Sequence, residues 1–284
     1  METIWKKIIP LALIAVLVFL GVLAAFVWNG VQRSEQEMAA LAQEQEQTRT
    51  NLLLTLAQED NSLCGVLVCS LDPKKQTADI ISIPTDTLAD VAGSNQELGA
   101  VPSIGGIQML LEKMPSILPL PITNYLAFQP DSFVKAVDLA GGVGFDVPYS
   151  ISQQMPGART SATVLRRGEQ TLDGAGAWAM MQYSGEGAAA QQTLQREFFK
   201  AYLEKLAAMD TQQLEPIIRD TIAQVTTDFS SYNTADYAAR LAAFNPADTQ
   251  AAVLPGTYRQ VDGQRFFCYQ ATEVNAFVNQ ILDR

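Results

Sequence analysis

The sequence contains no histidine, and this absence excludes several kinds of active site. Serine and cysteine nucleophiles that depend on a histidine base are ruled out, and a conventional zinc site is disfavoured. Basic residues are also few, because 19 Lys and Arg stand against 30 Asp and Glu, for a formal net charge of -11. Nucleic-acid binding needs a basic surface, so we expect no nucleic acid partner. A phosphate ligand would have to meet a local group of cations or a metal ion.

Cysteine is scarce as well, with three residues at Cys64, Cys69 and Cys268. Cys64 and Cys69 are five residues apart in an apolar run. On a regular strand they face opposite sides and cannot bridge each other. Buried free thiols are the favoured interpretation, because free cysteine is usually buried. A bond from either residue to Cys268 stays open at this point.

A long apolar run lies at residues 8–28, and its length matches the roughly 20 helical residues needed to cross a bilayer. The run lacks the short core and small-residue cleavage site of a signal peptide, so it predicts a transmembrane helix. Lys6 and Lys7 precede it, whereas Arg33 is the first basic residue after it. This asymmetry predicts a single-pass protein of the cell membrane, with residues 1–7 in the cytoplasm and the remainder outside.

The rest of the chain divides at about residue 50. Residues 29–50 are rich in Gln and Glu and predict a helical stalk or linker. A dimerising coiled coil is the less favoured alternative, because apolar heptads are not sustained. Residues 51–284 have the composition of a globular domain, in a chain with 48% hydrophobic and 17% charged residues. We therefore expect one extracytoplasmic domain of ordinary size.

Predicted strands and helices alternate along this domain. That order indicates an α/β fold, which we expect to be a single layered α-β-α domain with a central mixed sheet. The strands are expected at 51–57, 64–71, 78–83, 122–128 and 143–151, with a hairpin at 256–270, and the helices at 104–114, 130–142, 175–184, 191–209, 214–225, 234–244 and 271–282.

The stretch 80–87, IISIPTDT, contains the first candidate for a functional group. β-branched residues predict a strand that has to end at Pro84, because proline cannot donate to a sheet ladder. Asp86 would then lie on a loop beyond a strand end, where ligands often bind in open α/β sheets. The alternative is that Asp86 and its two threonine neighbours only cap a following helix.

Three longer segments in this order resemble the LytR-CpsA-Psr family, also called the cell envelope-related transcriptional attenuator domain. They are SLDPKKQTADIISIPTDT, ITNYLAFQPDSFVKAVDLAGGVGFDVP, and LRRGEQTLDGAGAWAMMQY with QREFFKAYLEKL. Family members transfer anionic glycopolymers, such as teichoic acids or capsular polysaccharide, from an undecaprenyl pyrophosphate carrier to peptidoglycan. The resemblance implies an apolar cleft for the isoprenoid tail, with arginines and a magnesium-binding carboxylate around the pyrophosphate.

Carried onto this sequence, the family pattern implies three site residues. Asp86 would be the catalytic residue and the ligand of Mg²⁺, and Gln195 and Arg196 would bind the substrate. Arginine forks and a divalent ion are well suited to neutralising a diphosphate. The implied partners are the membrane, a polyprenyl-linked glycopolymer or polyprenyl phosphate lipid, and peptidoglycan.

The chain is a divergent member, because it departs from the family pattern at the charged positions. A family acidic residue at the start of the second strand falls on Cys64. Five basic positions of the family are neutral here, and each lost phosphate contact removes roughly 1.5–3 kcal/mol. These five positions are Thr85, Gln182, Ser184, Gln191 and Leu194.

Two functions follow from these departures. The first is an active glycopolymer transferase, and the alternative is a catalytically inactive member that binds lipid phosphate or acts as a regulatory or scaffold partner. Activity belongs to the site and not to the fold, so the resemblance does not decide between them. Direct transcriptional regulation is disfavoured by the expected outside location and the acidic balance. The pair Arg166 and Arg167 is interpreted as solvated, because arginines are usually exposed. The apolar stripe of helix 104–114 is interpreted as core, with a lipid cavity as its alternative.

Overall fold

The computed structural model describes residues 49–154 and 161–283. The predicted cytoplasmic tail 1–7, transmembrane helix 8–28 and nearly all of the stalk 29–50 lie outside these residues. Within the described ranges, no helix has both the length and the apolar character that a bilayer span requires. The expectation of a transmembrane helix therefore remains a prediction about the N-terminal residues.

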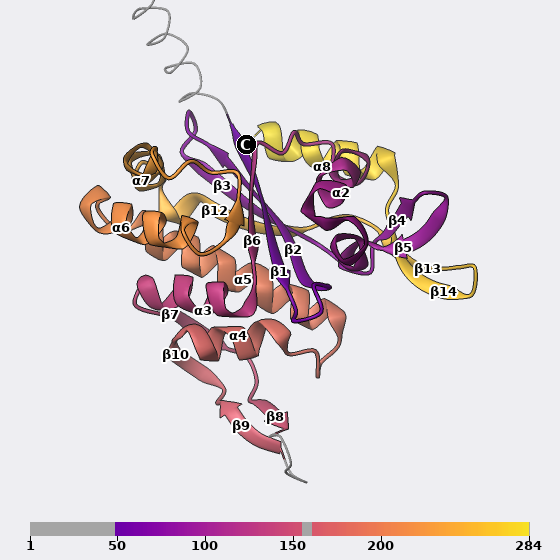
Figure 1. Cartoon of the computed structure of the whole chain (residues 1–284), viewed down its shortest axis with the longest axis horizontal. Coiled ribbons are helices and arrows are strands. Elements are labelled where there is room, and N and C mark those ends of the chain that lie inside the picture. Colours follow the sequence, from indigo (N-terminus) through magenta and orange to yellow (C-terminus); the bar gives the residue numbers. More distant parts are fainter. Residues whose placement is uncertain (1–48, 155–160, 284) are drawn as a thin grey trace, which may run out of the picture. The chain divides into compact units, whose positions relative to one another are not determined.

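A six-stranded mixed sheet forms the centre of the domain, as expected (Figure 1). In spatial order the strands are β11 (Thr226–Thr227), β6 (Asn124–Phe128), β1 (Thr50–Ala57), β2 (Leu63–Asp72), β3 (Thr77–Ile83) and β12 (Thr249–Val253). The β2 strand pairs antiparallel with β1 and β3, whereas β6 and β12 add in parallel at the outer sides of β1 and β3.

Helices cover both faces of this sheet, which makes the three layers of the predicted α-β-α domain (Figure 1). One face packs against α2 (Val101–Ile117) and α8 (Ala271–Asp283). The other face packs against α3 (Pro130–Leu139), α4 (Gly174–Gln182) and α5 (Ala188–Ala207), with α6 (Thr211–Ile222) and α7 (Thr234–Ala242) beyond them.

The side chains of each strand divide between the two cores because neighbouring residues point to opposite faces. On β3, Ile81 and Ile83 join the core under α2 and α8, while Ile80 joins the core under α5. Strands β1 to β3 are therefore nearly continuous apolar runs, as expected for strands covered on both faces.

The cysteines correct one expectation. Cys64 and Cys69 both lie in the core on the α5 side and not on opposite faces. The reason is a register shift between Leu56 and Ala57, whose partners are Gly65 and Leu63, so that Cys64 is an extra residue in β2. Such a bulge breaks the two-residue alternation. The preference for free thiols is confirmed, since all three cysteines are free.

The segment after β3 also differs from one interpretation. Residues Thr85 and Asp86 form a turn, and the chain continues into strand β4 (Leu88–Val91), which pairs with β5 (Ser94–Glu97). Neither β4 nor β5 is among the strands expected from the sequence. A helix capped by Asp86 is also ruled out, because the following element is a strand.

Helix boundaries are close to those expected, with local differences. The predicted helix 104–114 extends over Val101–Ile117 and bends at Gly105 and Gly106, whose backbone angles are not helical. Its stripe is core, as interpreted, because Leu110 and Met114 are fully buried. The α3 helix starts at Pro130, as expected, with Gln129 as its N-cap, and ends at Leu139, before the expected residue 142. Gly141 follows its C-terminal end at a φ of 73°.

Four two-stranded pairs complete the fold, two of them formed within hairpins close to Asp86. The strand expected at 143–151 is divided in the structure, because residues 148–150 separate β7 (Val143–Val147) from β8 (Ile151–Gln154). The predicted C-terminal hairpin turns at Asp262 and Gly263, both with positive φ. The pairs are β4 with β5, β7 (Val143–Val147) with β10 (Gly168–Leu172), β8 (Ile151–Gln154) with β9 (Ser161–Leu165), and β13 (Thr257–Val261) with β14 (Gln264–Cys268).

Candidate functional site

Asp86 is held in the turn after β3 by its main chain and by its side chain. The carbonyl oxygen of Asp86 accepts a hydrogen bond of 2.9 Å from the Phe267 N–H on β14. The Oδ1 atom of Asp86 accepts one of 3.4 Å from the Tyr258 hydroxyl on β13. The neighbouring Thr87 is buried and closes the turn by donating from Oγ1 to the Pro84 carbonyl at 2.6 Å. The carboxylate is half-buried and has a defined orientation.

Tyr258 connects Asp86 to helix α5. The side chain of Gln192 hydrogen-bonds to the Tyr258 hydroxyl, and the guanidinium carbon of Arg265 lies 4.1 Å from the centre of the Tyr258 ring. Burial, followed by the charge of the Asp86 carboxylate, raises the pKa of Tyr258. The phenol therefore stays protonated at neutral pH and can donate to Asp86.

Arg196 lies one helical turn beyond Gln192 on α5. Its Nη1 donates to the Oγ of Ser82 near the end of β3, at 3.2 Å, and its Nε lies 3.5 Å from Oε1 of the half-exposed Glu197. Ser82 is four residues before Asp86. The structure therefore brings Asp86 and Arg196, two of the three predicted site residues, to the same end of the sheet.

Gln195, the third predicted residue, is in a different environment. Its side chain is buried, and its Nε2 donates to the Cys64 carbonyl at 2.8 Å and to the Met181 carbonyl at 2.9 Å. These bonds join α5 to β2 and to the end of α4. A contact between Gln195 and substrate stays a prediction, whereas its role in holding the three elements together is visible.

The positions where the resemblance expects arginines are occupied as follows. Gln182 and Ser184 are exposed at the end of α4, Leu194 is buried, and Gln191 donates from Nε2 to the Met181 carbonyl at 2.8 Å. Thr85 is half-buried beside Gly99, whose N–H donates to the Thr85 carbonyl. Some of the positions where the resemblance expects arginines are therefore occupied by residues that take part in internal packing and hydrogen bonds.

Arg166 and Arg167 do not join this site. Both are exposed at the connection between β9 and β10, where the N–H of Arg167 donates to Ser150 Oγ and the carbonyl of Arg166 accepts from Gln170. The strands β9 and β10 lie beyond α3 and α4, far from the β13–β14 hairpin (Figure 1). Their interpretation as a solvated pair is confirmed.

The residues around Asp86 fit Mg²⁺ only as an ion shared with a phosphate ligand. Among residues 49–154 and 161–283, no group of three Asp, Glu, His or Cys side chains could hold a metal. Cys64 stands where the resemblance expects an acidic residue at the start of the second strand. Burial raises the pKa of its thiol to about 11. A protonated thiol is a poor ligand for a hard cation, but Mg²⁺ is often bound by one carboxylate together with substrate phosphates and water.

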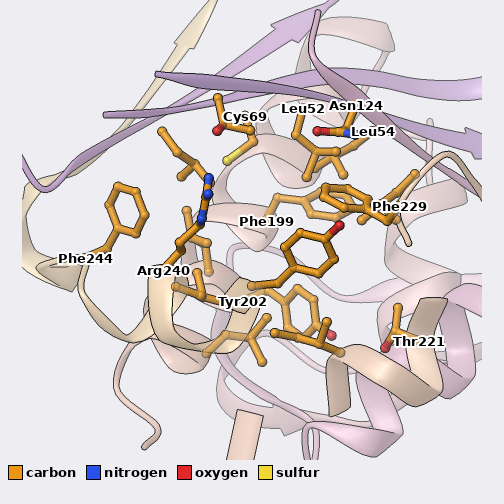
Figure 2. A pocket seen from close by; sticks show the side chains of 18 of the residues that line it. Leu52, Leu54, Cys69, Asn124, Phe199, Tyr202, Thr221, Phe229, Arg240 and Phe244 are labelled. Carbon is orange, nitrogen blue, oxygen red and sulfur yellow. The ribbon is translucent and has the colours of Figure 1, made fainter. Parts of the chain in front are cut away.

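An apolar cavity of about 240 Å³ lies between the sheet and helices α5, α6 and α7. Figure 2 shows Leu52 and Leu54 of β1 on one side of it and Phe199 and Tyr202 of α5 facing them. Other lining residues come from α6 and α7, and Arg240 of α7 contributes a guanidinium. The family resemblance implied an apolar cleft, but the sequence did not identify the residues that line this cavity. Its walls come from segments up to about two hundred residues apart, and each of these segments has the pattern of ordinary core.

Helix α5 connects the cavity to the polar cluster. The residues on one face of α5 recur at spacings of three or four, which places them in a row along the helix. Proceeding from its N-terminal part, this row contains Gln192, Arg196, Phe199, Leu203 and Leu206. The first two contact Tyr258 and Ser82 near Asp86, and the last three line the cavity.

The fold and this arrangement define a layered α-β-α protein in which one face of α5 contacts a polar cluster near its N-terminal part and an apolar cavity further along. The chain belongs to the LytR_cpsA_psr family, whose family model matches residues 58–282. This assignment to the family rests on a match over most of the chain. It agrees with the resemblance seen in the three sequence segments.

Several curated proteins are similar to this chain. The chain is 24% identical over 250 residues to the polyisoprenyl-teichoic acid–peptidoglycan teichoic acid transferase TagV of Bacillus subtilis, a match covering 79% of this chain and 64% of that protein. It is 25% identical over 167 residues to the corresponding transferase TagU of Halalkalibacterium halodurans, covering 57% of this chain and 54% of that protein. The matched part thus spans less than two thirds of the length of these relatives.

Solved structures share the fold. The structure of Bacillus subtilis TagV superimposes with a TM-score of 0.72 at 20% identity and covers 84% of this chain and 97% of that one. A structure described as TagT bound to LIIa-WTA gives a TM-score of 0.70 at 16% identity, covering 84% of this chain and 91% of that one.

Proposed function

We propose that this chain is a membrane-anchored protein of the cell envelope that binds a polyprenyl-linked anionic glycopolymer outside the cell membrane. The isoprenoid tail occupies the apolar cavity, and the diphosphate lies at Arg196 and Asp86. The named relatives act on polyisoprenyl-linked teichoic acid and peptidoglycan, and glycopolymers of this class are the proposed ligands here.

The change from polar to apolar along α5 is the observation that carries this proposal. Arg196 is followed on the same face by Phe199, Leu203 and Leu206 in the wall of the cavity. A lipid diphosphate is charged at one end and apolar at the other, so it can follow this face from Asp86 to the cavity. A cavity lined almost entirely by apolar side chains, with a few polar groups at one end, is typical of such ligand sites.

Electrostatics support the placement of the diphosphate. Arg196 presents a guanidinium that can form paired bonds to phosphate oxygens. Asp86 alone would repel a diphosphate, and it is the residue that would hold a Mg²⁺ ion at this end of the site. When bound, Mg²⁺ would supply charge neutralisation at the diphosphate.

Binding without efficient transfer is the form of this function that we favour. The five family cation positions carry neutral residues, and Gln191 and Leu194 are engaged in internal contacts. Each missing charge-assisted contact removes roughly 1.5–3 kcal/mol of phosphate stabilisation. Arg196 cannot replace several of them, so we expect transfer to be slow or absent while lipid binding persists.

The test uses the full chain in detergent micelles with a polyprenyl diphosphate, in the presence and absence of Mg²⁺. Lipid binding and phosphate release are measured in the same samples, with Asp86→Ala and Asp90→Ala as matched variants, because Asp90 is an exposed carboxylate on the neighbouring strand. We expect binding with little release. Rapid Mg²⁺-dependent release that Asp86→Ala abolishes and Asp90→Ala leaves intact would establish the active transferase instead. Absence of lipid binding would refute the proposal.

A further inference from the structure

The C-terminal hairpin β13–β14 is fixed to the segment that contains Asp86. Besides the hydrogen bond from Phe267 N–H to the Asp86 carbonyl, Thr87 and Phe267 form a parallel bridge. At its tip, Gln264 donates to Glu97 Oε1 at 3.0 Å, and Asp262 Oδ2 accepts from Asn95 at 2.8 Å. These contacts give the hairpin a defined position beside the carboxylate.

The hairpin carries an arginine whose polar atoms are available. Arg265 is exposed on β14, and its guanidinium stacks on the ring of Tyr258, the residue that donates to Asp86. A guanidinium stacked through its face keeps its N–H donors at the edge of the plane. Within the described parts of the chain, the Arg265 side chain has this ring contact but no ion pair with a carboxylate.

The two arginines approach the site from different elements. Arg196 comes from α5 and contacts Ser82, whereas Arg265 comes from β14 and contacts Tyr258. Gln192 on α5 hydrogen-bonds to the same tyrosine, so the hairpin and the helix meet at Tyr258. The charge of a diphosphate in an acidic protein needs more than one cation nearby.

We propose that Arg265 is a second phosphate-binding residue of this site, which supplies from the C-terminal hairpin a cation that the chain lacks at Thr85. This inference rests on the proposed function and deepens it, because it names the groups that hold the phosphate end of the ligand. Tyr258 positions the guanidinium through its ring and the Asp86 carboxylate through its hydroxyl.

A purely structural role for Arg265 would lead to a different effect of its substitution on ligand binding. If the arginine only covered the ring of Tyr258, its loss would disturb the hairpin equally for ligands with and without phosphate. If Arg265 contacts phosphate, its loss should instead weaken binding of the ligand that carries phosphate and leave the affinity for the ligand without phosphate unchanged. The comparison of a polyprenyl diphosphate with a polyprenol of the same chain length therefore separates the two roles.

The experiment measures dissociation constants of the full chain in detergent for these two lipids. The variant is Arg265→Gln, and the matched control is Arg259→Gln, which removes an exposed arginine from the facing strand of the same hairpin. We expect Arg265→Gln to weaken diphosphate binding about tenfold, as for one charge-assisted contact. Binding of the polyprenol and both affinities of Arg259→Gln should stay within about twofold of the unsubstituted chain.

The outcomes distinguish this inference from the proposed function. If the unsubstituted chain prefers the diphosphate and Arg265→Gln matches Arg259→Gln, the inference fails while the proposed function stands. An equal loss for both lipids would show a structural role and would also overturn it. If the unsubstituted chain binds neither lipid, the proposed function fails and the inference fails with it.

Discussion

The two sides of the central sheet are built from the same strands but are packed differently. Towards α2 and α8, the side chains fill the space, and Leu110 and Met114 are fully buried. Towards α5, α6 and α7, the same sheet borders an apolar cavity of about 240 Å³. Both sides have the apolar strand residues and amphipathic helices of an ordinary core.

The difference shows that apolar composition does not determine whether a region is filled. The cavity is partly open, so its apolar lining remains in contact with water. An apolar ligand that covered this lining would stabilise the folded chain.

Shortening an apolar side chain should have the largest effect on the filled side. We expect Leu110→Ala to lower the free energy of unfolding by about 2–5 kcal/mol, because it creates a new void. Leu203→Ala, at the cavity wall, should cost only about 1 kcal/mol, since Leu203 is half-buried and already borders empty space. Urea unfolding of both variants measures the difference, and equal losses would contradict the comparison.

Filling the cavity should affect binding more than stability. Leu203→Trp places an indole in the cavity and should weaken binding of polyprenyl lipids about 100-fold, with a stability change of about 1 kcal/mol. The control is Leu282→Trp, which adds the same group at an exposed position of α8. Isothermal titration and thermal unfolding give the two quantities. Tight lipid binding by Leu203→Trp would show that the tail lies elsewhere.

Removing a charge at the polar end of α5 should affect only phosphorylated ligands. We expect Arg196→Gln to weaken binding of a polyprenyl diphosphate about tenfold and to leave the polyprenol unchanged. Arg219→Gln serves as the control, because Arg219 is exposed on α6 and pairs with Asp220. A loss confined to the control variant, or a loss of polyprenol affinity in Arg196→Gln, would rule out this assignment.

The smallest predicted effect is the pH dependence of stability on the α5 side. Burial raises the pKa of the Cys64 thiol to about 11, from its ordinary value of 9.0 in the unfolded chain. Between these values the folded state retains a proton that the unfolded state loses, so stability falls as pH rises. We expect a loss of about 1 kcal/mol between pH 9 and 10 from this group. Unfolding of Cys64→Ala should show a smaller decrease over that interval, and an unchanged slope would contradict the prediction.

Local patterns were sufficient for much of the fold. Apolar runs predicted β1 to β3, and the C-terminal hairpin was also predicted. The same reasoning failed at Cys64, because a bulge depends on how two strands pair and not on the composition of either. It also gave no sign of the strand β12, which completes the sheet as an edge beside β3.

The candidate site was only partly visible in the sequence. Asp86 and Arg196 were identified from motifs, but Tyr258 and Arg265 were read simply as parts of a hairpin. Neither residue type is unusual in a strand, so no local signal distinguished them. Their significance depends on the hydrogen bond between Phe267 and the Asp86 carbonyl, which brings residues about 180 positions apart into contact.

By itself, the sequence determined the family, the layered α/β class, the acidic balance and the carboxylate after Pro84, because these depend on residue types and their local order. Only the tertiary structure decided that Gln195 joins three elements, that Arg265 lies over Tyr258, and that the space beside α5 is a cavity. The reason is that the distance between helices α5 to α7 and the sheet is set by the packing of the whole domain. An apolar stripe has the same sequence pattern whether its partner lies in contact or a cavity lies between them.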